Sequence, residues 1–307
     1  MFLCYLILIK KMKISGFTYV RNGLAMGYPF EQSIQSVLPL VDELYVVVGD
    51  STDGTREAVE NIGDNKIIII DSVWDMSKRA GGQIFREQSN IGLKQCKGDW
   101  LFHIQADEVL HESAPEKIRK YIELADKYDD IDGLLFSYYH FWGDYHYIRK
   151  TREVHRLEIR AFKNNRDVLS HNDSQGFRKY PDGENSKGIK LNVIKTDIPV
   201  YHYSYTRNPK LMKNKSNYFH RFWHSDEWLK RNVDEKEFDF NEVDKLDIFE
   251  GEHPKYMKDV IKNKDWEFKY DPSKSNMSFK DKLLYAFEKQ FNYRLFENKN
   301  YIIKDVK

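Results

Sequence analysis

The sequence is poor in cysteine, in net charge and in long apolar segments, and each shortage excludes a class of protein. Its two cysteines, Cys4 and Cys96, are too few for a disulfide framework and lack the paired spacing of a zinc site. The formal charge of +1 gives no overall attraction to nucleic acid or to a membrane. The apolar run at residues 1–9 is too short to span a bilayer and lacks the flanks of a secretion signal. We therefore expect a cytoplasmic protein with no nucleic-acid partner.

Internal repeats and low-complexity linkers are also absent, and the composition is that of a globular chain. With 307 residues, 41% of them hydrophobic and 32% charged, the chain is long enough for one large domain or for one domain with appendages. Its 20 Tyr, 19 Phe and 6 Trp indicate an aromatic core and, secondarily, a cleft that stacks on rings or sugars.

From residue 14 to about residue 141, short apolar runs alternate with helical periodicity, which is typical of an α/β fold. Strands are expected at residues 14–20, 43–48, 66–70, 100–104 and 133–139. Helices are expected after Pro29, at 55–62, at 82–96, and after Ser113, which forms a capping-box pattern with Glu116. Crossovers of this kind predict a mainly parallel sheet flanked by helices, with its ligand crevice beyond the carboxyl ends of the strands.

The pattern changes after residue 142. Shorter strands, expected at residues 157–162, 189–194 and 200–205, indicate a smaller mixed half of the same domain at residues 143–209. Beyond residue 209 the chain is rich in Lys, Asn and aromatic residues, with weak helical signals around 210–229. We therefore divide the chain into an N-terminal extension (1–13), an α/β half (14–142), the mixed half (143–209) and a helical, aromatic and basic C-terminal region (210–307).

Acidic side chains end the fourth expected strand, where an apolar run leads directly into Asp107 and Glu108. Carboxylates at the carboxyl end of a strand suit a site for a metal ion and a phosphate, although a solvated turn has the same composition. The turns after the first two strands suit either contacts to a nucleoside or simple capping chemistry. Their candidate side chains are Tyr19, Arg21, Asp50 and Ser51.

Three motifs follow one another in this half of the chain. Residues 47–55, Val-Val-Gly-Asp-Ser-Thr-Asp-Gly-Thr, come first, and Ser-Asn-Ile-Gly-Leu at 89–93 is followed by Gly-Asp-Trp at 98–100. Gln-Ala-Asp at 105–107 comes third. In this order they resemble the signatures of the family 2 glycosyltransferases of the GT-A fold. Gly49 and Gln105 stand where that family usually has aspartates, so the nucleotide and metal contacts are expected to depart from the standard ones.

The resemblance implies an inverting glycosyltransferase that moves a sugar from a nucleoside-diphosphate donor to a glycan or lipid-linked acceptor. A setting in bacterial surface polysaccharide synthesis is implied in the same way. Residues 14–142 would bind the nucleotide sugar, and residues 143–209 would form the acceptor side. Because the leaving diphosphate develops negative charge, a hard cation or Arg and Lys must neutralise it. The implied cofactor is Mn²⁺ or Mg²⁺ on Asp107 and Glu108, with His202 as a third ligand or, equally, a core histidine.

The resemblance also assigns nucleotide contacts and a base. Four further nucleotide-binding candidates are Asp75, Arg79, Asn90 and Arg207. An inverting transfer needs a general base for the acceptor hydroxyl. Asp173, in a polar loop downstream of the acidic motif, is the first candidate, and Glu158, which alternation in a strand can simply pair with arginine, is its rival.

The sequence is also compatible with two other functions and with two roles for the C-terminal helix. A sugar nucleotidyltransferase would need a better triphosphate loop than residues 19–23, and the departures at Gly49 and Gln105 leave room for a catalytically silent binding module. Residues 278–292 form an amphipathic helix that either docks on the catalytic domain or makes peripheral contact with the inner face of a membrane. Its apolar face carries Leu283, Leu284, Phe287 and Phe291, and its flanks carry Phe279, Lys280, Lys282 and Lys289.

Overall fold

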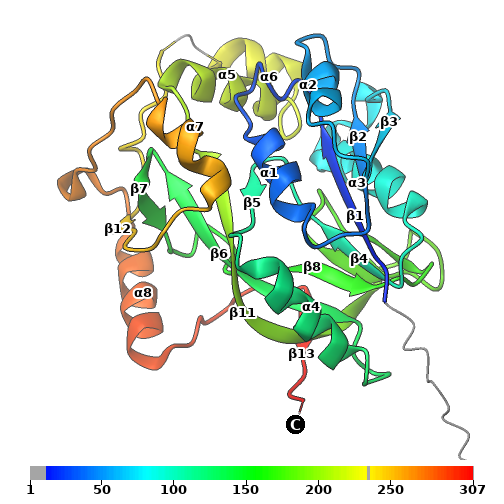
Figure 1. Ribbon diagram of the computed structural model, residues 1–307. Coiled ribbons are helices and arrows are strands. Elements are labelled where there is room, and N and C mark those ends of the chain that lie inside the picture. Colours follow the sequence, from blue (N-terminus) through cyan, green and yellow to red (C-terminus); the bar gives the residue numbers. More distant parts are fainter. Residues whose placement is uncertain (1–11, 234–235, 307) are drawn as a thin grey trace, which may run out of the picture.

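A mixed β-sheet with helices packed on it organises the protein, and the computed structural model describes residues 12–233 and 236–306 (Figure 1). Four parallel strands form its first half, in the order β3-β2-β1-β4. They are β1 (Ile14–Val20), β2 (Glu43–Val48), β3 (Ile67–Asp71) and β4 (Trp100–His103). The strands predicted from the sequence agree with these bounds to within one residue.

Helices connect these strands and create a core on each face of the sheet. They are α1 (Phe30–Val37), α2 (Thr55–Asn61), α3 (Gln83–Gln95) and α4 (Ala114–Ala125). Successive side chains of a strand point to opposite faces, so Phe102 packs in the core with α1 and α4 while Leu101 packs in the core with α3. Phe17 is fully buried in the second core, which contributes about 1.5–3 kcal/mol to stability.

The second half of the sheet is less regular than the sequence indicates. β8 (Leu157–Lys163) runs antiparallel between β4 and β6 (Gly133–Trp142), so the sheet is mixed rather than nearly all parallel. The two strands expected at 189–194 and 200–205 form one strand, β11 (Ile189–Tyr205). The register of β11 against β6 shifts near Thr196. The strand continues there because the Thr196 hydroxyl donates to the Leu135 carbonyl and accepts from the Ile198 amide.

The short strand β5 (Glu108–Val109) follows the acidic motif and pairs antiparallel with β11. The other strands are β7 (Asp144–Arg149), β9 (Val168–Ser170), β10 (Phe177–Lys179), β12 (Asp247–Ile248) and β13 (Tyr301–Ile303). β13 pairs in parallel with β11, so the end of the chain returns to the main sheet.

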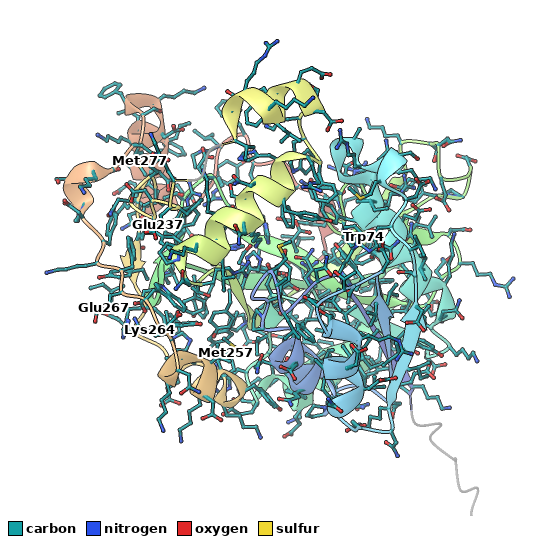
Figure 2. All side chains as sticks on the ribbon, turned by 90° about the horizontal axis from the view of Figure 1, so that it is seen from above. Trp74, Glu237, Met257, Lys264, Glu267 and Met277 are labelled. Carbon is teal, nitrogen blue, oxygen red and sulfur yellow. The ribbon has the colours of Figure 1, made fainter. Side chains whose placement is uncertain are left out.

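The later helices are α5 (Pro209–His220), α6 (Asp226–Asn232), α7 (Lys258–Lys262) and α8 (Phe279–Phe291). α5 and α6 cross the end of the molecule at which β1 and β2 finish, as the view onto that end shows (Figure 2). α8 begins at Ser278, whose hydroxyl accepts from the Asp281 amide, in agreement with the predicted tail helix. The capping box predicted at Ser113 is wrong, since the Ser113 hydroxyl contacts His111 instead of the helix amides.

Two predictions concern membranes and the N-terminus. Residues 1–11, most of the predicted N-terminal extension, lie outside the described residues. In the part of the chain that is described, no helix combines the length and the apolar character needed to cross a bilayer.

Candidate active site

A cavity of about 550 Å³ lies beyond the carboxyl ends of β1 and β4, under α5. Its walls are rich in aromatic side chains, and its polar groups come from the end of β1, the acidic motif, the loop between β9 and β10, β11 and α5. Both halves of the sheet and the C-terminal region therefore contribute to one site. The polar and charged side chains that line it include Arg21, Gln105, Asp107, Asp173, His202, Ser204, Lys215, Ser216 and His220.

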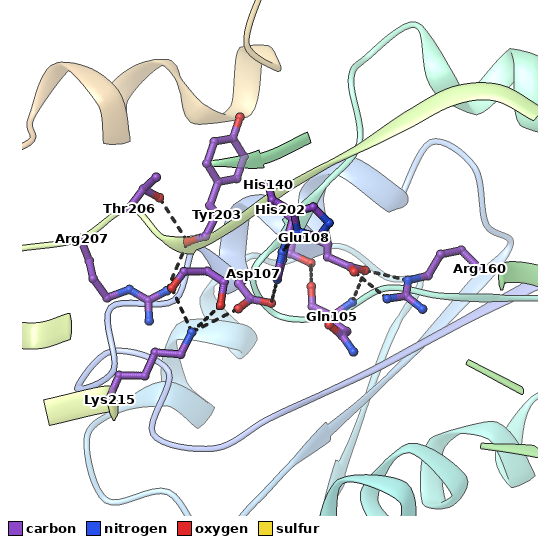
Figure 3. Close-up of polar contacts among 12 residues, drawn as sticks. Gln105, Asp107, Glu108, His140, Arg160, His202, Tyr203, Thr206, Arg207 and Lys215 are labelled. Carbon is purple, nitrogen blue, oxygen red and sulfur yellow. Dashed lines mark hydrogen bonds and ion pairs between the residues drawn. The ribbon is translucent and has the colours of Figure 1, made fainter. Parts of the chain in front are cut away.

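Asp107 lines this cavity and lies close to His202 and Lys215 (Figure 3). The Tyr203 amide donates to its backbone carbonyl at 2.8 Å, which fixes the acidic turn against β11. One carboxylate oxygen lies 3.5 Å from Nε2 of His202, and the other lies 3.6 Å from Nζ of Lys215. Burial alone would raise the pKa of Asp107, but His202, Lys215 and Arg207 outweigh it and hold this pKa well below its usual range. Asp107 is therefore a permanent anion in a positive setting.

Glu108 does not face the cavity, which departs from its predicted role as a metal ligand. Its carboxylate is fully buried and binds the Arg160 guanidinium through both oxygens, at 2.6 and 2.9 Å. The backbone amide of Gln105 donates to one of the same oxygens at 3.0 Å. Because the next residue of an extended chain points to the opposite side, Glu108 is directed into the sheet when Asp107 is directed into the cavity.

A divalent cation fits Asp107 and His202 but finds no third ligand of the usual kind. Within residues 12–233 and 236–306, no three His, Cys, Asp or Glu side chains come together around a common point. A carboxylate and an imidazole are ligands that Mn²⁺ and Mg²⁺ accept, and such ions commonly complete their shells with water and substrate phosphates. The site therefore suits an ion whose binding depends on the substrate.

Lys215 in the cavity wall and Arg207 beside it, both over the ring of the lining residue Tyr28, make this region strongly positive. Lys215, on α5, is buried and donates to the backbone carbonyl and hydroxyl of Ser204 at 3.0 and 2.7 Å. Burial, reinforced by Arg207, lowers the pKa of Lys215 to about 7 although Asp107 opposes the shift. Arg207 is also buried, and its Nε and Nη1 atoms have no hydrogen-bond partner among the described residues. Arg207, a nucleotide-binding candidate from the sequence, lies beside the cavity rather than in its lining, whereas Lys215, which lines it, was not expected from the sequence.

Asp173 lies in a strained loop that turns its carboxylate into the cavity. The residues on both sides of it, Asn172 and Ser174, have φ angles of 50° and 72°, in the left-handed region that costs free energy for residues with a Cβ atom. Among the described residues, Oδ1 of Asp173 has no hydrogen-bond partner. Burial raises the pKa of this carboxyl group, despite opposing hydrogen bonds. An oxygen without a partner and a raised pKa suit a carboxylate that accepts a proton.

Glu158, the rival base, lies on β8 and does not line the cavity. Burial raises its pKa to about 8, although the neighbouring Arg160 opposes this shift. Glu158 is therefore protonated and neutral near pH 7, which does not suit a base.

The nucleotide-binding candidates divide into two groups. Tyr19 and Arg21 line the cavity, and Arg21 pairs with Asp50 at 2.8 Å and donates to the Tyr218 hydroxyl. The side chains of the other candidates make hydrogen bonds or ion pairs within the protein. The Ser51 hydroxyl accepts from the Asn22 backbone amide, and the Asp75 carboxylate caps the Met76–Lys78 turn. Arg79 pairs with Asp226, and the side chain of Asn90 accepts from the Ser170 amide.

Gly49, which replaces a family aspartate, has a steric explanation. A Cβ atom at this position would lie 2.6 Å from Nε1 of Trp74 and 3.0 Å from Cβ of Arg21. Trp74 lines the cavity and packs edge-on against Phe85, with the ring centroids 5.6 Å apart. The indole therefore takes the space that a longer side chain at residue 49 would need.

Comparisons with known proteins identify the family to which the chain is similar. Residues 29–183, half of the chain, match the family described as Glycosyl transferase family 2. An uncharacterized glycosyltransferase of Rickettsia bellii is 27% identical over 222 residues, and one of Rickettsia prowazekii is 29% identical over 215 residues. Each match covers 67% of this chain and 65% of the relative, so the chain spans about two thirds of the length of these relatives.

Among solved structures, S. aureus TarS 1-349 is similar with 15% identity and a TM-score of 0.39, covering 68% of this chain and 64% of that one. A glucosyl-3-phosphoglycerate synthase from Mycobacterium tuberculosis, in complex with Mn²⁺, UDP and phosphoglyceric acid, has 20% identity and a TM-score of 0.29, covering 42% and 43%. The family match includes Asp107 and Asp173 but ends before His202, Arg207 and Lys215. The α/β fold class and the family predicted from the motifs are confirmed, and the chain belongs to glycosyl transferase family 2.

Proposed function

We propose that the protein transfers a sugar, with inversion, from a nucleoside-diphosphate donor to a hydroxyl group of a glycan or lipid-linked acceptor. One observation carries this proposal: the cavity wall holds buried Lys215 beside Asp107, with Arg207 next to the lining residue Tyr28, and the same cavity is lined by Asp173, whose Oδ1 has no hydrogen-bond partner among the described residues. The positive charge suits a diphosphate, and Oδ1 of Asp173 suits an acceptor hydroxyl.

Lys215 and Arg207 stabilise the leaving group in this proposal. Cleavage of the sugar-phosphate bond leaves a nucleoside diphosphate, and a preorganised cation in a buried site stabilises the developing charge more than water does. Arg207, whose Nε and Nη1 atoms have no hydrogen-bond partner among the described residues, adds positive charge beside the cavity. Asp107 and His202 would hold Mn²⁺ or Mg²⁺, which when bound neutralises diphosphate charge as a Lewis acid.

Asp173 acts as the general base. It takes the proton of the acceptor hydroxyl as that oxygen attacks the anomeric carbon on the face opposite the departing diphosphate, which inverts the configuration. Its pKa, raised by burial, brings its proton affinity closer to the working pH than that of an exposed aspartate. Tyr19 and the Arg21–Asp50 pair would contact the nucleoside, and the stacked rings of Trp142 and Tyr205, at 4.2 Å, offer an apolar wall for a sugar ring.

The setting we propose is the cytoplasmic face of a bacterial membrane, in surface polysaccharide synthesis, with α8 as the peripheral contact. Its outward side chains Phe279, Leu283 and Phe291 are exposed by 76%, 58% and 62%. Such a helix would bring the cavity close to a lipid-linked acceptor.

A thermal-shift screen of the purified protein tests the donor class. UDP, GDP, CDP and dTDP are each added with and without Mn²⁺, and one of them is expected to raise Tm, because a ligand that binds only the folded state stabilises it. The corresponding nucleotide sugar is then tested for release of the nucleoside diphosphate in the presence of acceptor extracts. Failure of all four nucleotides to bind contradicts the proposal, and binding without any turnover favours the silent binding module.

A further inference from the structure

His202 has ring-nitrogen contacts on both sides, and the strand register creates them. In the pairing of β11 with β6, His202 is the direct partner of His140, and in the pairing of β11 with β5 it is the partner of Glu108, next to Asp107. The Nδ1 atoms of His140 and His202 lie 2.8 Å apart, and Nε2 of His140 lies 2.7 Å from the backbone carbonyl of His155. Nε2 of His202 faces Asp107 at 3.5 Å (Figure 3). The result is a continuous series of contacts from the His155 carbonyl, through the rings of His140 and His202, to the Asp107 carboxylate.

The carbonyl at one end fixes the proton positions along this chain. A carbonyl oxygen only accepts, so Nε2 of His140 carries a proton and donates it to His155. Two ring nitrogens 2.8 Å apart share one proton. If His140 is neutral, its Nδ1 atom is the acceptor, and Nδ1 of His202 is the donor. Nε2 of His202 is then the ring nitrogen that faces the cavity, and in the neutral ring it carries the lone pair.

The alternative assignment needs a doubly protonated His140, which its surroundings disfavour. Its side chain is buried, with 7% exposure, and its ring stacks on Tyr138 at 5.3 Å and meets the His155 ring edge-on at 4.5 Å. The Arg160 guanidinium already lies over the same Tyr138 ring at 5.5 Å. A second cation in this apolar environment would cost free energy, and the carboxylate of Glu108 is already engaged by Arg160.

We propose that His140 is a positioning residue that locks His202 in the Nδ1–H tautomer, so that the Nε2 lone pair and Asp107 together receive a divalent cation. This inference rests on the metal-assisted transfer of the proposed function. A lone pair that faces a carboxylate oxygen is repulsive unless a cation lies between them. Their 3.5 Å separation is close to the ~3.0–3.5 Å between neighbouring ligand atoms that each lie ~2.1 Å from one ion.

Metal titration of full-length variants tests the role of His140. Mn²⁺ binding is followed by the electron paramagnetic resonance signal of the free ion, in the parent protein and in His140→Phe, which keeps a ring but removes both contacts. We expect Mn²⁺ to bind ~10–100-fold more weakly. His140→Gln supplies one N–H and one acceptor oxygen, so it is expected to restore part of the affinity. His253→Phe is the matched control, because His253 also contacts a backbone carbonyl, that of Tyr145, but its other nitrogen contacts the Tyr203 hydroxyl instead of His202.

The Asp107→Asn variant separates the two ideas. If it binds Mn²⁺ as tightly as the parent, the proposed metal site is wrong, whatever His140 does. If Asp107→Asn loses Mn²⁺ while a folded His140→Phe keeps the parent affinity, the metal site stands and the inference about His140 is overturned.

The parent protein also provides a test that needs no variant. In ¹⁵N-histidine-labelled protein with Mg²⁺, long-range ¹H–¹⁵N correlations distinguish protonated from unprotonated ring nitrogens. We expect a proton on Nε2 but not on Nδ1 of His140, and a proton on Nδ1 but not on Nε2 of His202. A proton on Nδ1 of His140 would overturn the inference, even if His140→Phe does not fold.

Discussion

Lys215 and Asp107 lie 108 residues apart in the sequence, and their charged groups are 3.6 Å apart in the wall of the cavity. The pair joins α5 to the acidic turn before β5, so the C-terminal region completes a site that the sheet begins. Because burying a lone ammonium is costly, the position of Lys215 depends on Asp107 and on Ser204. A bound diphosphate would add the negative charge that this arrangement lacks, which leads to the first two predictions.

Asp107→Asn is expected to reduce sugar transfer by more than ~10²-fold, because it removes the negative charge of this side chain while almost keeping its shape. The fold should survive, which circular dichroism and a thermal melt would verify beside the product assay. Asp107→Ala is a poorer probe of this role. It removes both carboxylate oxygens beside buried Lys215 and leaves a cavity, so a loss of stability would be added to the loss of charge. Near-normal turnover in Asp107→Asn would contradict the assignment of this carboxylate.

Lys215→Met is expected to weaken nucleoside-diphosphate binding by ~10-fold or more, since one charge-assisted hydrogen bond contributes ~1.5–3 kcal/mol. Calorimetric titration with the nucleotide identified by the thermal-shift screen measures this loss. Lys210→Met is the matched control, because Lys210 is an exposed lysine on the same helix and should bind the nucleotide like the parent. Equal affinities for both variants and the parent would exclude Lys215 from the diphosphate site.

Asp173→Asn is expected to abolish transfer while donor binding stays within a factor of about two, because a general base contacts the acceptor rather than the diphosphate. Product assays and calorimetry must therefore diverge for this variant. Glu158→Gln provides the contrast, since a residue outside the cavity should be replaceable without loss of transfer. If Asp173→Asn turns over like the parent and Glu158→Gln does not, the two assignments are reversed.

Glu158 also predicts how stability depends on pH. Its ordinary pKa is 4.5, and burial raises it to about 8 in the folded protein. Between these values the folded state binds the proton more tightly than the unfolded state, so the free energy of unfolding falls as pH rises, by up to about 1.4 kcal/mol per pH unit. Urea unfolding of Glu158→Gln and of the parent should show the variant gaining relative stability from about pH 6 to about pH 8. A pH-independent difference would mean that Glu158 is already ionised in the folded protein.

The sequence predicted the elements whose signals are local. The apolar runs of β1 and β2 and the acidic residue Asp107 at the end of one such run are visible without tertiary information. Lys215 is not, because α5 carries three lysines and only packing distinguishes the one that enters the cavity. Glu108 looked equivalent to Asp107 by composition. The partner that engages it, Arg160, comes from β8, and the sequence does not reveal that this strand is inserted antiparallel beside β4.

The last prediction concerns α8, which has two different faces. Glu288 on one face pairs with Arg294 and Arg156, which docks the helix on the protein. Phe279 and Leu283 are exposed on the side away from Glu288, Phe291 is exposed near the end of the helix, and the tail helix also carries Lys280, Lys282 and Lys289. A helix that docks by ion pairs and leaves its apolar side chains in water suits an interface with anionic lipid, where apolar burial and lysine charge act together.

Vesicle sedimentation of variants with substitutions in α8 tests this contact. A deletion of the residues after Asn276 is unsuitable, because it would also remove β13 and the hydrogen bonds that Arg294 donates to the rest of the protein. Leu283→Glu combined with Phe291→Glu should abolish binding to vesicles that contain anionic lipid, while transfer to a water-soluble acceptor continues at the parent rate. Binding of the parent should also fall as salt is raised, since the lysine contribution is screened. If the parent ignores anionic vesicles even at low salt, the exposed face of α8 is not a membrane contact, and the acceptor reaches the cavity from solution.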